Sequence, residues 1–408
     1  MNSTNADLPD GKDDNARNGD TGGRRQALAG VRVLDLSRLL PGPVASLHLA
    51  DLGADVIKIE DTGAGDYARS MGDGPDGCSF FFRAVNRNKR GLQLDLKQAA
   101  GREVLTRLVA GADILLESFR PGVMDRLGLG YDALREINPR LVYCAITGYG
   151  QEGPWAQRAG HDLNYIAQAG VLEQTGCREG APAIPALQIG DLLGGAMTAV
   201  SAMLAALIMA RQTGEGSLVD VAMTDAVLAH NLFPLFALQA AGTLPARGDD
   251  LLTGGHANYA VYETADGRHM AVAPLEEKFW QLFCQAIERP DLAPRYADTA
   301  NPALHRELAA LFASQTQAYW TARFDTIDCC VTPVRSLPET LTHPQTRARQ
   351  MVISADGMLQ YAPPFRISGC DFAVDRLAPT PGEHSAQILT DAGYTADEIA
   401  ALRQLRIV

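Results

Sequence analysis

The chain has 408 residues, of which 46% are hydrophobic and 21% are charged, and its formal net charge is −12. This balance is typical of a globular protein with a large core, and at roughly 150 residues per domain the length predicts two or three domains. An acidic chain without a basic arm is a poor candidate for a nucleic-acid-binding protein, although a local cationic pocket for a small anion is compatible with it.

The first 25 residues are polar and nearly free of large apolar side chains, so we expect a disordered tail and find no secretion signal in it. The seven cysteines show neither CxxC spacing nor a Cys/His pattern. Their scatter favours reduced thiols. We therefore expect a cytoplasmic protein without a metal site.

Strand and helix patterns alternate through the first 150 residues. Residues 30–36 and 54–60 read as buried strands, with a helix over 44–52 between them. This βαβ order predicts a parallel sheet, and no GxGxxG fingerprint accompanies it. The Pro41-Gly42-Pro43 turn should place a helix N-terminus with free N–H groups at the carboxyl end of the first strand, where open α/β sheets bind anions.

Cations gather at two places in this part of the chain. Arg87, Lys89 and Arg90 occupy three of four positions before a strand over 92–96, and they predict either a solvated turn or a phosphate site. Arg120 and Arg126 follow a strand over 113–117. A further strand covers 141–146, so the second pair of arginines lies just past a strand end.

Residues 192–210 carry no charge and are long enough for a membrane helix. Their Ala, Gly, Ser and Thr content favours a buried helix in a soluble protein, so we expect no membrane insertion. A hairpin with an Asp266-Gly267 turn follows later in the chain. The change from alternating strand and helix patterns to a hairpin followed by helices predicts three parts of the chain. These are a large domain over 26–222, a linker helix and small domain over 223–340, and a C-terminal segment over 341–408 that returns to the large domain.

His161 and Asp191 are the leading candidates for catalysis, and they lie 191 − 161 = 30 residues apart among glycines. An imidazole titrates near neutral pH and suits proton transfer, although a lone histidine is more often a structural hydrogen-bonding group. Asp191 reads as the N-cap of the apolar helix, and the same carboxylate can serve as a base or nucleophile. Glu276 is either a surface carboxylate or a residue that orients the imidazole.

The sequence lacks a GxSxG elbow, a Walker loop, an HExxH pair and an EF-hand. These absences argue against a serine hydrolase, a P-loop NTPase, a zinc protease and a calcium protein.

A series of segments, in order along the chain, resembles the class III CoA-transferase superfamily, which includes the α-methylacyl-CoA racemases. The similarity covers about residues 26 to 408, and it rests on residues 30–60, 86–96, 119–122, 160–165, 190–191 and 264–267. The Gly-His-Asp-Leu-Asn-Tyr sequence that contains His161 resembles the racemase pattern, and transferases usually lack that histidine. Glu276 matches a racemase position whose carboxylate hydrogen-bonds the histidine.

The resemblance implies an α/β fold with a Rossmann-like large domain made from both chain ends, a smaller α+β domain and an obligate, interlocked homodimer. Lys89, Arg120 and Arg126 match positions that contact the CoA phosphates or adenosine. Arg90, Tyr165 and Gly190 are further candidate contacts to the substrate or to CoA. Two departures are Asp61, where many members have arginine, and Asn258, where racemases tend to have an aromatic residue.

The implied activity is epimerisation of the α-carbon of 2-methyl-branched acyl-CoA thioesters. His161 and Asp191 would exchange the proton from opposite faces, and N–H groups at the start of the Asp191 helix would stabilise the enolate oxygen. CoA is part of the substrate, so we expect no separate cofactor. One alternative is CoA transfer between carboxylic acids with Asp191 as nucleophile, and another is a catalytically silent protein that binds CoA esters.

Overall fold

The computed structural model describes residues 25–408, so the predicted tail lies outside the described residues except for Arg25. The described chain divides into two compact units. The first unit comprises residues 25–169, 187–230 and 345–408, and the second comprises 170–186 and 231–344. The domain limits that we predicted, 26–222, 223–340 and 341–408, stay predictions beside this division.

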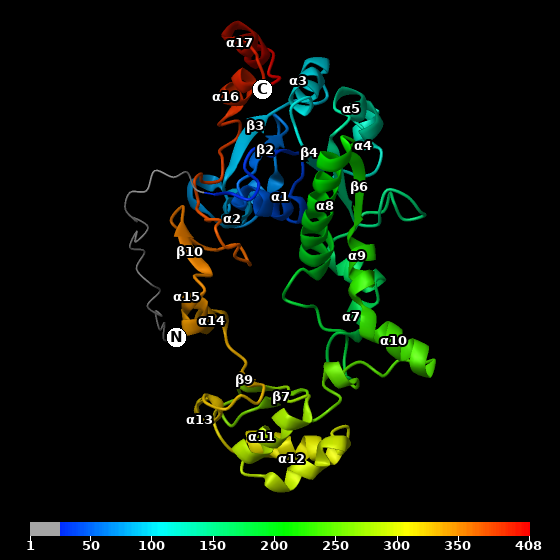
Figure 1. Cartoon of the computed structure of the whole chain (residues 1–408), viewed down its shortest axis with the longest axis vertical. Coiled ribbons are helices and arrows are strands. Elements are labelled where there is room, and N and C mark those ends of the chain that lie inside the picture. Colours follow the sequence, from blue (N-terminus) through cyan, green and yellow to red (C-terminus); the bar gives the residue numbers. More distant parts are fainter. Residues whose placement is uncertain (1–24) are drawn as a thin grey trace. The chain divides into compact units, whose positions relative to one another are not determined.

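A six-stranded parallel sheet forms the centre of the first unit (Figure 1). Its strand order is β3-β2-β1-β4-β5-β6, the order of a doubly wound α/β fold, which confirms the predicted fold class. The strands are β1 (Arg32–Asp35), β2 (Asp55–Glu60), β3 (Lys89–Gln93), β4 (Ile114–Glu117), β5 (Val142–Thr147) and β6 (Ser217–Ala222).

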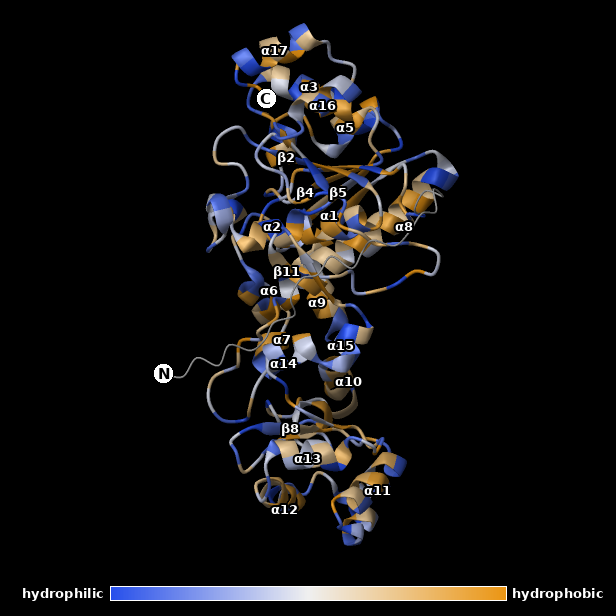
Figure 2. Ribbon diagram, turned by 90° about the vertical axis from the view of Figure 1, so that its left-hand side faces the viewer, coloured by the Kyte–Doolittle hydropathy of each residue, from blue (hydrophilic) through white to orange (hydrophobic). Residues whose placement is uncertain are grey.

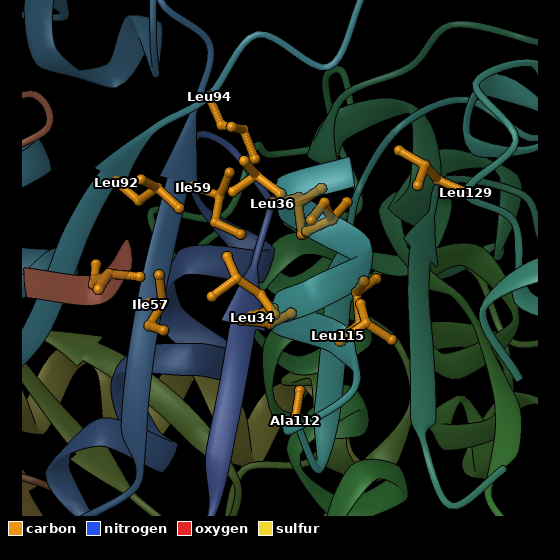
Figure 3. Close-up of a cluster of buried hydrophobic side chains, with 14 of the residues drawn as sticks. Leu34, Leu36, Ile57, Ile59, Leu92, Leu94, Ala112, Leu115 and Leu129 are labelled. Atoms are coloured by element: carbon orange, nitrogen blue, oxygen red, sulfur yellow. The ribbon is translucent and has the colours of Figure 1, made fainter. Parts of the chain in front are cut away.

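Helices cover both faces of this sheet because successive side chains along a strand point to opposite faces. Leu34 belongs to one core cluster, shown in Figure 3, while its neighbour Val33 belongs to the other. The first cluster is completed by α3 (Ala99–Val109), α4 (Val123–Arg126), α5 (Tyr131–Ile137), α16 (Ser385–Asp391) and α17 (Ala396–Gln404). The second is completed by α1 (Pro41–Asp51), α8 (Thr198–Thr213) and residues of α6 (Asp162–Gln168) and η3 (Gly190–Met197).

Shorter elements complete the first unit. They are η1 (Tyr67–Ser70), η2 (Pro75–Gly77), α2 (Phe80–Asn86), α9 (Met223–His230), β10 (Val352–Ala355) and β11 (Met358–Tyr361). The last two pair as an antiparallel ribbon. Helix α15 (Pro344–Ala348) begins where the chain passes from the second unit back to the first.

The second unit has an antiparallel sheet of β7 (Ala260–Glu263), β8 (His269–Val272) and β9 (Val331–Pro333). The predicted hairpin with its Asp266-Gly267 turn is confirmed by the pairing of β7 with β8. Trp280 and Phe283 lie in a largely aromatic core. The remaining elements are α7 (Val171–Gln174), α10 (Leu232–Ala241), η4 (Leu251–Thr253), α11 (Glu277–Ala286), η5 (Pro290–Asp298), α12 (Pro302–Phe312), α13 (Gln317–Phe324) and α14 (Leu337–Thr342).

The apolar stretch predicted over 192–210 is helical from Gly190 to Thr213. It is long and apolar enough to cross a membrane by length and composition, and 44% of its most apolar window is buried. Ala199, Met203 and Leu207 pack into the second core cluster against the sheet, and Figure 2 shows the hydrophobic residues along α8. Such packing is that of a core helix, and one apolar helix is weak support for a membrane span.

Candidate functional site

The strand order reverses between β1 and β4, and open α/β sheets bind ligands in the crevice outside the carboxyl ends of the strands at such a point. The loops that leave these two strands adjoin. The backbone N–H of Arg38 donates to Ser118 Oγ at 3.2 Å. The Arg38 guanidinium lies 5.6 Å from the centre of the Phe119 ring. We call this junction of residues 37–38 and 118–122 the switch-point loops.

Arginines lie at this edge of the sheet. Arg120 and Arg126, both predicted from the sequence, are exposed, and neither forms an ion pair within residues 25–408. Arg38 was missed by the sequence analysis. Arg38 follows the end of β1 as Arg120 follows the end of β4. This equivalent position in the sequence could have identified Arg38 as a candidate. Asp61, the departure from the family pattern, pairs with Arg38 at 2.9 Å.

Lys89 and Arg90 do not form the open basic patch that was one interpretation of their spacing. Lys89 is fully buried, and its ammonium donates to Asp35 at 3.2 Å, to the Pro43 carbonyl at 2.9 Å and to Asn86 at 2.8 Å. These three bonds leave its ammonium no free N–H for a phosphate. The solvated-turn interpretation is also wrong, because these residues begin the buried strand β3.

Acidic partners far away in sequence let these cations enter the core. Arg90 is 5% exposed and makes two hydrogen bonds to Asp55, at 2.9 and 2.7 Å, and one to Asp391 at 2.8 Å. Burial opposes the charge of Asp35, but Lys89 and Lys58 outweigh it and lower the pKa of Asp35 to about 2.

The helix N-terminus predicted after β1 does not offer a row of free donors. Helix α1 begins at Pro41, earlier than predicted, and Pro43 is its third residue. Proline has no backbone N–H, so Gly42 is the donor left among these three residues. An anion at this turn would therefore need side chains such as Arg38 to hold it.

A hollow of about 570 Å³ lies at the opposite, amino edge of the sheet, where Arg32 and Asp55 begin their strands. Several charges in its lining pair with one another, as Arg32 and Arg90 both do with Asp55. We place the candidate site at the carboxyl edge instead, because open α/β sheets bind ligands there at the point where the strand order reverses. No group of three or more His, Cys, Asp and Glu side chains within residues 25–408 is arranged to hold a metal ion.

His161 is the N-cap residue of α6, and it is exposed. Its backbone N–H donates to Asn164 Oδ1 at 3.0 Å. Tyr165 is buried, and its hydroxyl donates to the Gly160 carbonyl at 2.5 Å. Its contact with the substrate stays a prediction. A Cβ at Gly160 would lie 2.6 Å from the Tyr165 ring, so the absent side chain admits the ring beside His161.

Asp191 is the second residue of η3, a stretch of π-helix, and it is half-buried. The predicted N-cap position is wrong, because Ile189 caps the helix. The wider π-helical turn is a deviation that recurs at functional sites. The Asp191 N–H donates to Asp162 Oδ1 at 3.1 Å, and the Leu192 N–H donates to the Gln188 carbonyl at 2.9 Å. These two N–H groups are therefore not free to stabilise an enolate oxygen, contrary to our expectation.

The structure places the start of η3 against the start of α6 within the first unit, because Asp162, the neighbour of His161, accepts the Asp191 N–H. Burial and, second, the charge of Asp162 together raise the pKa of Asp191 to about 6, against the opposing charge of His161. The imidazole and the carboxylate thus act on each other electrostatically, although 30 residues separate them in the sequence. A carboxylate of this kind is a stronger base than an ordinary aspartate and is still mostly ionised at neutral pH.

Glycines let η3 approach its neighbours. A Cβ at Gly190 would lie 3.0 Å from Asp162 Oδ1, and one at Gly195 would lie 2.7 Å from Pro41 Cβ. A Cβ at Gly194 would meet the Met223 carbonyl at 2.7 Å. Gly194 and Gly195 therefore make room for α9 and α1.

Glu276 is the exposed N-cap residue of α11 in the second unit. Its side chain makes no capping hydrogen bond. The approach of Glu276 to His161 stays a prediction.

The sequence matches the family model described as CoA-transferase family III over residues 28–385. It is 36% identical over 386 residues to an alpha-methylacyl-CoA racemase of Mus musculus, covering 93% of this chain and 97% of the relative. It is 34% identical over 395 residues to a succinate–glutarate CoA-transferase of Agrobacterium fabrum, covering 90% and 96%. The crystal structure of a CAIB/BAIF family protein from Brucella suis aligns with a TM-score of 0.80 at 31% identity, covering 90% of this chain and 99% of that one.

Proposed function

Because this chain belongs to CoA-transferase family III, we propose that it epimerises the α-carbon of 2-methyl-branched acyl-CoA thioesters. The observation that carries the proposal is the electrostatic interaction of His161 with Asp191, whose pKa is raised to about 6 where Asp162, the neighbour of His161, accepts the Asp191 N–H. The similarity to alpha-methylacyl-CoA racemases agrees with it.

The thioester α-proton is weakly acidic, so its removal requires a base held beside the carbon. In one direction the Asp191 carboxylate takes the proton, and the C–H electron pair moves into an enolate whose charge lies on the thioester oxygen. The protonated His161 then gives a proton to the opposite face of the carbon, which inverts it. In the other direction the two groups exchange roles.

Arg38, Arg120 and Arg126 are proposed to hold the CoA phosphates at the switch-point loops. Arginine offers a planar set of donors that suits phosphate oxygens. The site places positive charge at this edge of a chain whose formal net charge is −12. Lys89 and Arg90 would act indirectly, because their ion pairs tie β3 to Asp35 of β1 and to Asp55 of β2.

CoA transfer between carboxylic acids is the second candidate. The similarity to a succinate–glutarate CoA-transferase at 34% identity favours it, and so does the partly desolvated carboxylate of Asp191. In this reaction Asp191 attacks the thioester carbonyl, CoA leaves as the thiolate, and an acyl anhydride forms on the aspartate. The CoA thiolate then attacks the aspartyl carbonyl of the anhydride, which releases the donor acid as its carboxylate and gives an aspartyl-CoA thioester.

We also propose that the chain works as a homodimer. Helix α10 is apolar but buries none of its residues, and Phe233 and Phe236 are 60% and 53% exposed. An apolar surface of this kind marks an interaction site in a stable protein. A second copy of the chain is the partner that the family resemblance implies.

The test compares the wild-type protein with His161→Ala and Asp191→Asn on a 2-methylacyl-CoA in deuterated water. Loss of α-deuterium incorporation in both variants, with CoA binding retained, is expected. If His161→Ala exchanges at the wild-type rate, the two-base assignment is wrong. A covalent adduct on Asp191 found by mass spectrometry would favour the transferase instead.

A further inference from the structure

Glu117, the last residue of β4, is a buried carboxylate without a cationic partner among residues 25–408. It is 5% exposed. The charged groups that face it are Asp125 of α4 and Asp220 of β6, which repel it. Burying a carboxylate in this way is costly unless its hydrogen bonds repay the loss of water.

Two hydrogen bonds reach this carboxylate. The backbone N–H of Phe119 donates to Oε2 at 2.6 Å, and the Tyr143 hydroxyl of β5 donates to Oε1 at 3.4 Å. Burial raises the pKa of Glu117 to about 7, against the opposing effect of the bond from Phe119. The short bond to Phe119 is therefore the main contact that the buried group makes.

That bond fixes a segment on which several parts of the candidate site converge. Ser118 accepts from the Arg38 N–H, and the Phe119 ring faces the Arg38 guanidinium. Arg120 follows directly. The Pro121 carbonyl accepts from Gln157 Nε2 at 3.0 Å, in the loop that leads to His161. The segment ends at Gly122, whose φ of 79° lies in the left-handed region that favours glycine.

We propose that Glu117 is a positioning residue for CoA binding: by accepting the Phe119 N–H, it holds the switch-point loops so that Arg38 and Arg120 face the same anionic ligand. The inference rests on the proposed role of this edge in binding CoA. It does not depend on whether the reaction is epimerisation or CoA transfer.

The experiment measures the Kd of free CoA by calorimetry for the wild type, Glu117→Gln and Glu117→Ala. The glutamine keeps an oxygen that accepts the Phe119 N–H, so its Kd should stay within about threefold of the wild-type value. The alanine loses the acceptor, and its Kd should rise about tenfold or more, since charged hydrogen bonds contribute that much. Tyr143→Phe is the matched control. It removes the longer bond alone and should change the Kd by less than about threefold.

The pH profile separates positioning from a merely structural role. The ionised carboxylate accepts the Phe119 N–H more strongly, so the wild-type Kd should fall as pH rises through about 7. The profile of Glu117→Gln should lack this step. A wild-type Kd that improves as pH falls would mean that Glu117 acts by repelling phosphate charge, and it would overturn the proposal.

An unchanged Kd in folded Glu117→Ala would overturn the proposal as well. If that variant does not fold, the comparison of wild type with Glu117→Gln across pH decides the matter. Failure of the proposed function is a separate outcome: the wild-type protein would not bind CoA, or Arg120→Ala would bind it as tightly as the wild type.

Discussion

Replacing Asp162 by asparagine should lower the pKa of Asp191. Asp162 acts on Asp191 in two ways. Its Oδ1 accepts the Asp191 N–H at 3.1 Å, and its charge raises the pKa of the Asp191 carboxyl. Asparagine keeps an oxygen at the same place and removes the charge. The substitution therefore changes the electrostatics of the site more than its geometry.

The magnitude follows from the causes of the shift. The pKa of Asp191 rises from 3.8 to about 6, which corresponds to about 3 kcal/mol at 1.36 kcal/mol per pKa unit. Burial is the largest cause and Asp162 the second, while His161 opposes both. Asp162 thus supplies less than half of the combined raising effect, and we expect the substitution to lower the pKa of Asp191 by on the order of 1, or about 1 kcal/mol.

The assay is kcat/KM for α-proton exchange measured across pH. A raised carboxyl pKa means that the base form is lost as pH falls through about 6, so the wild-type rate should decline below that value. In Asp162→Asn the decline should begin at a lower pH. The matched control is Asp132→Asn, which removes an exposed charge from the first turn of α5. An acidic limb that stays in place or moves to higher pH in Asp162→Asn would refute the reasoning.

Lys89→Met should destabilise the fold by roughly 3–5 kcal/mol in chemical unfolding, because it leaves Asp35 buried and unpaired. The folded variant should bind CoA within twofold of wild type. Loss of CoA binding at unchanged stability would contradict this and would indicate that Lys89 contacts a phosphate directly. Gly160→Ala should reduce exchange more than tenfold while lowering stability by about 1–3 kcal/mol, since its Cβ would lie 2.6 Å from the Tyr165 ring. Wild-type exchange rates in this variant would show that the ring does not position His161. Phe236→Asp on α10 should convert the proposed dimer into monomers in analytical ultracentrifugation. If the variant self-associates as tightly as the wild type, α10 does not form the dimer interface.

The parallel sheet could be predicted because its strands are apolar runs separated by helical periods. Residues 54–60 and 141–146 are examples, and β2 and β5 cover nearly the same positions. The carboxyl edge of the sheet, where we propose that CoA binds, also followed from chain order. Arg120 could be placed there because it directly follows a strand.

The buried charges could not be predicted, because their partners are distant in sequence. Lys89 lies 54 residues from Asp35, and no residue near Lys89 in the sequence indicates that it pairs with a buried carboxylate. The same holds for the π-helical turn at Asp191, since the apolar pattern does not distinguish it from the start of an α-helix. Proximity of His161 and Asp191 came from the family resemblance and not from their spacing.

The fate of the α-hydrogen tests the central claim most directly. The protein is incubated with a 2-methylacyl-CoA and a free acceptor carboxylate in deuterated water, and the thioesters are analysed by mass spectrometry. We expect α-deuterium in the original thioester, inversion of the carbon and no thioester of the acceptor. An acceptor thioester that forms without α-deuterium would contradict it and assign Asp191 the role of nucleophile.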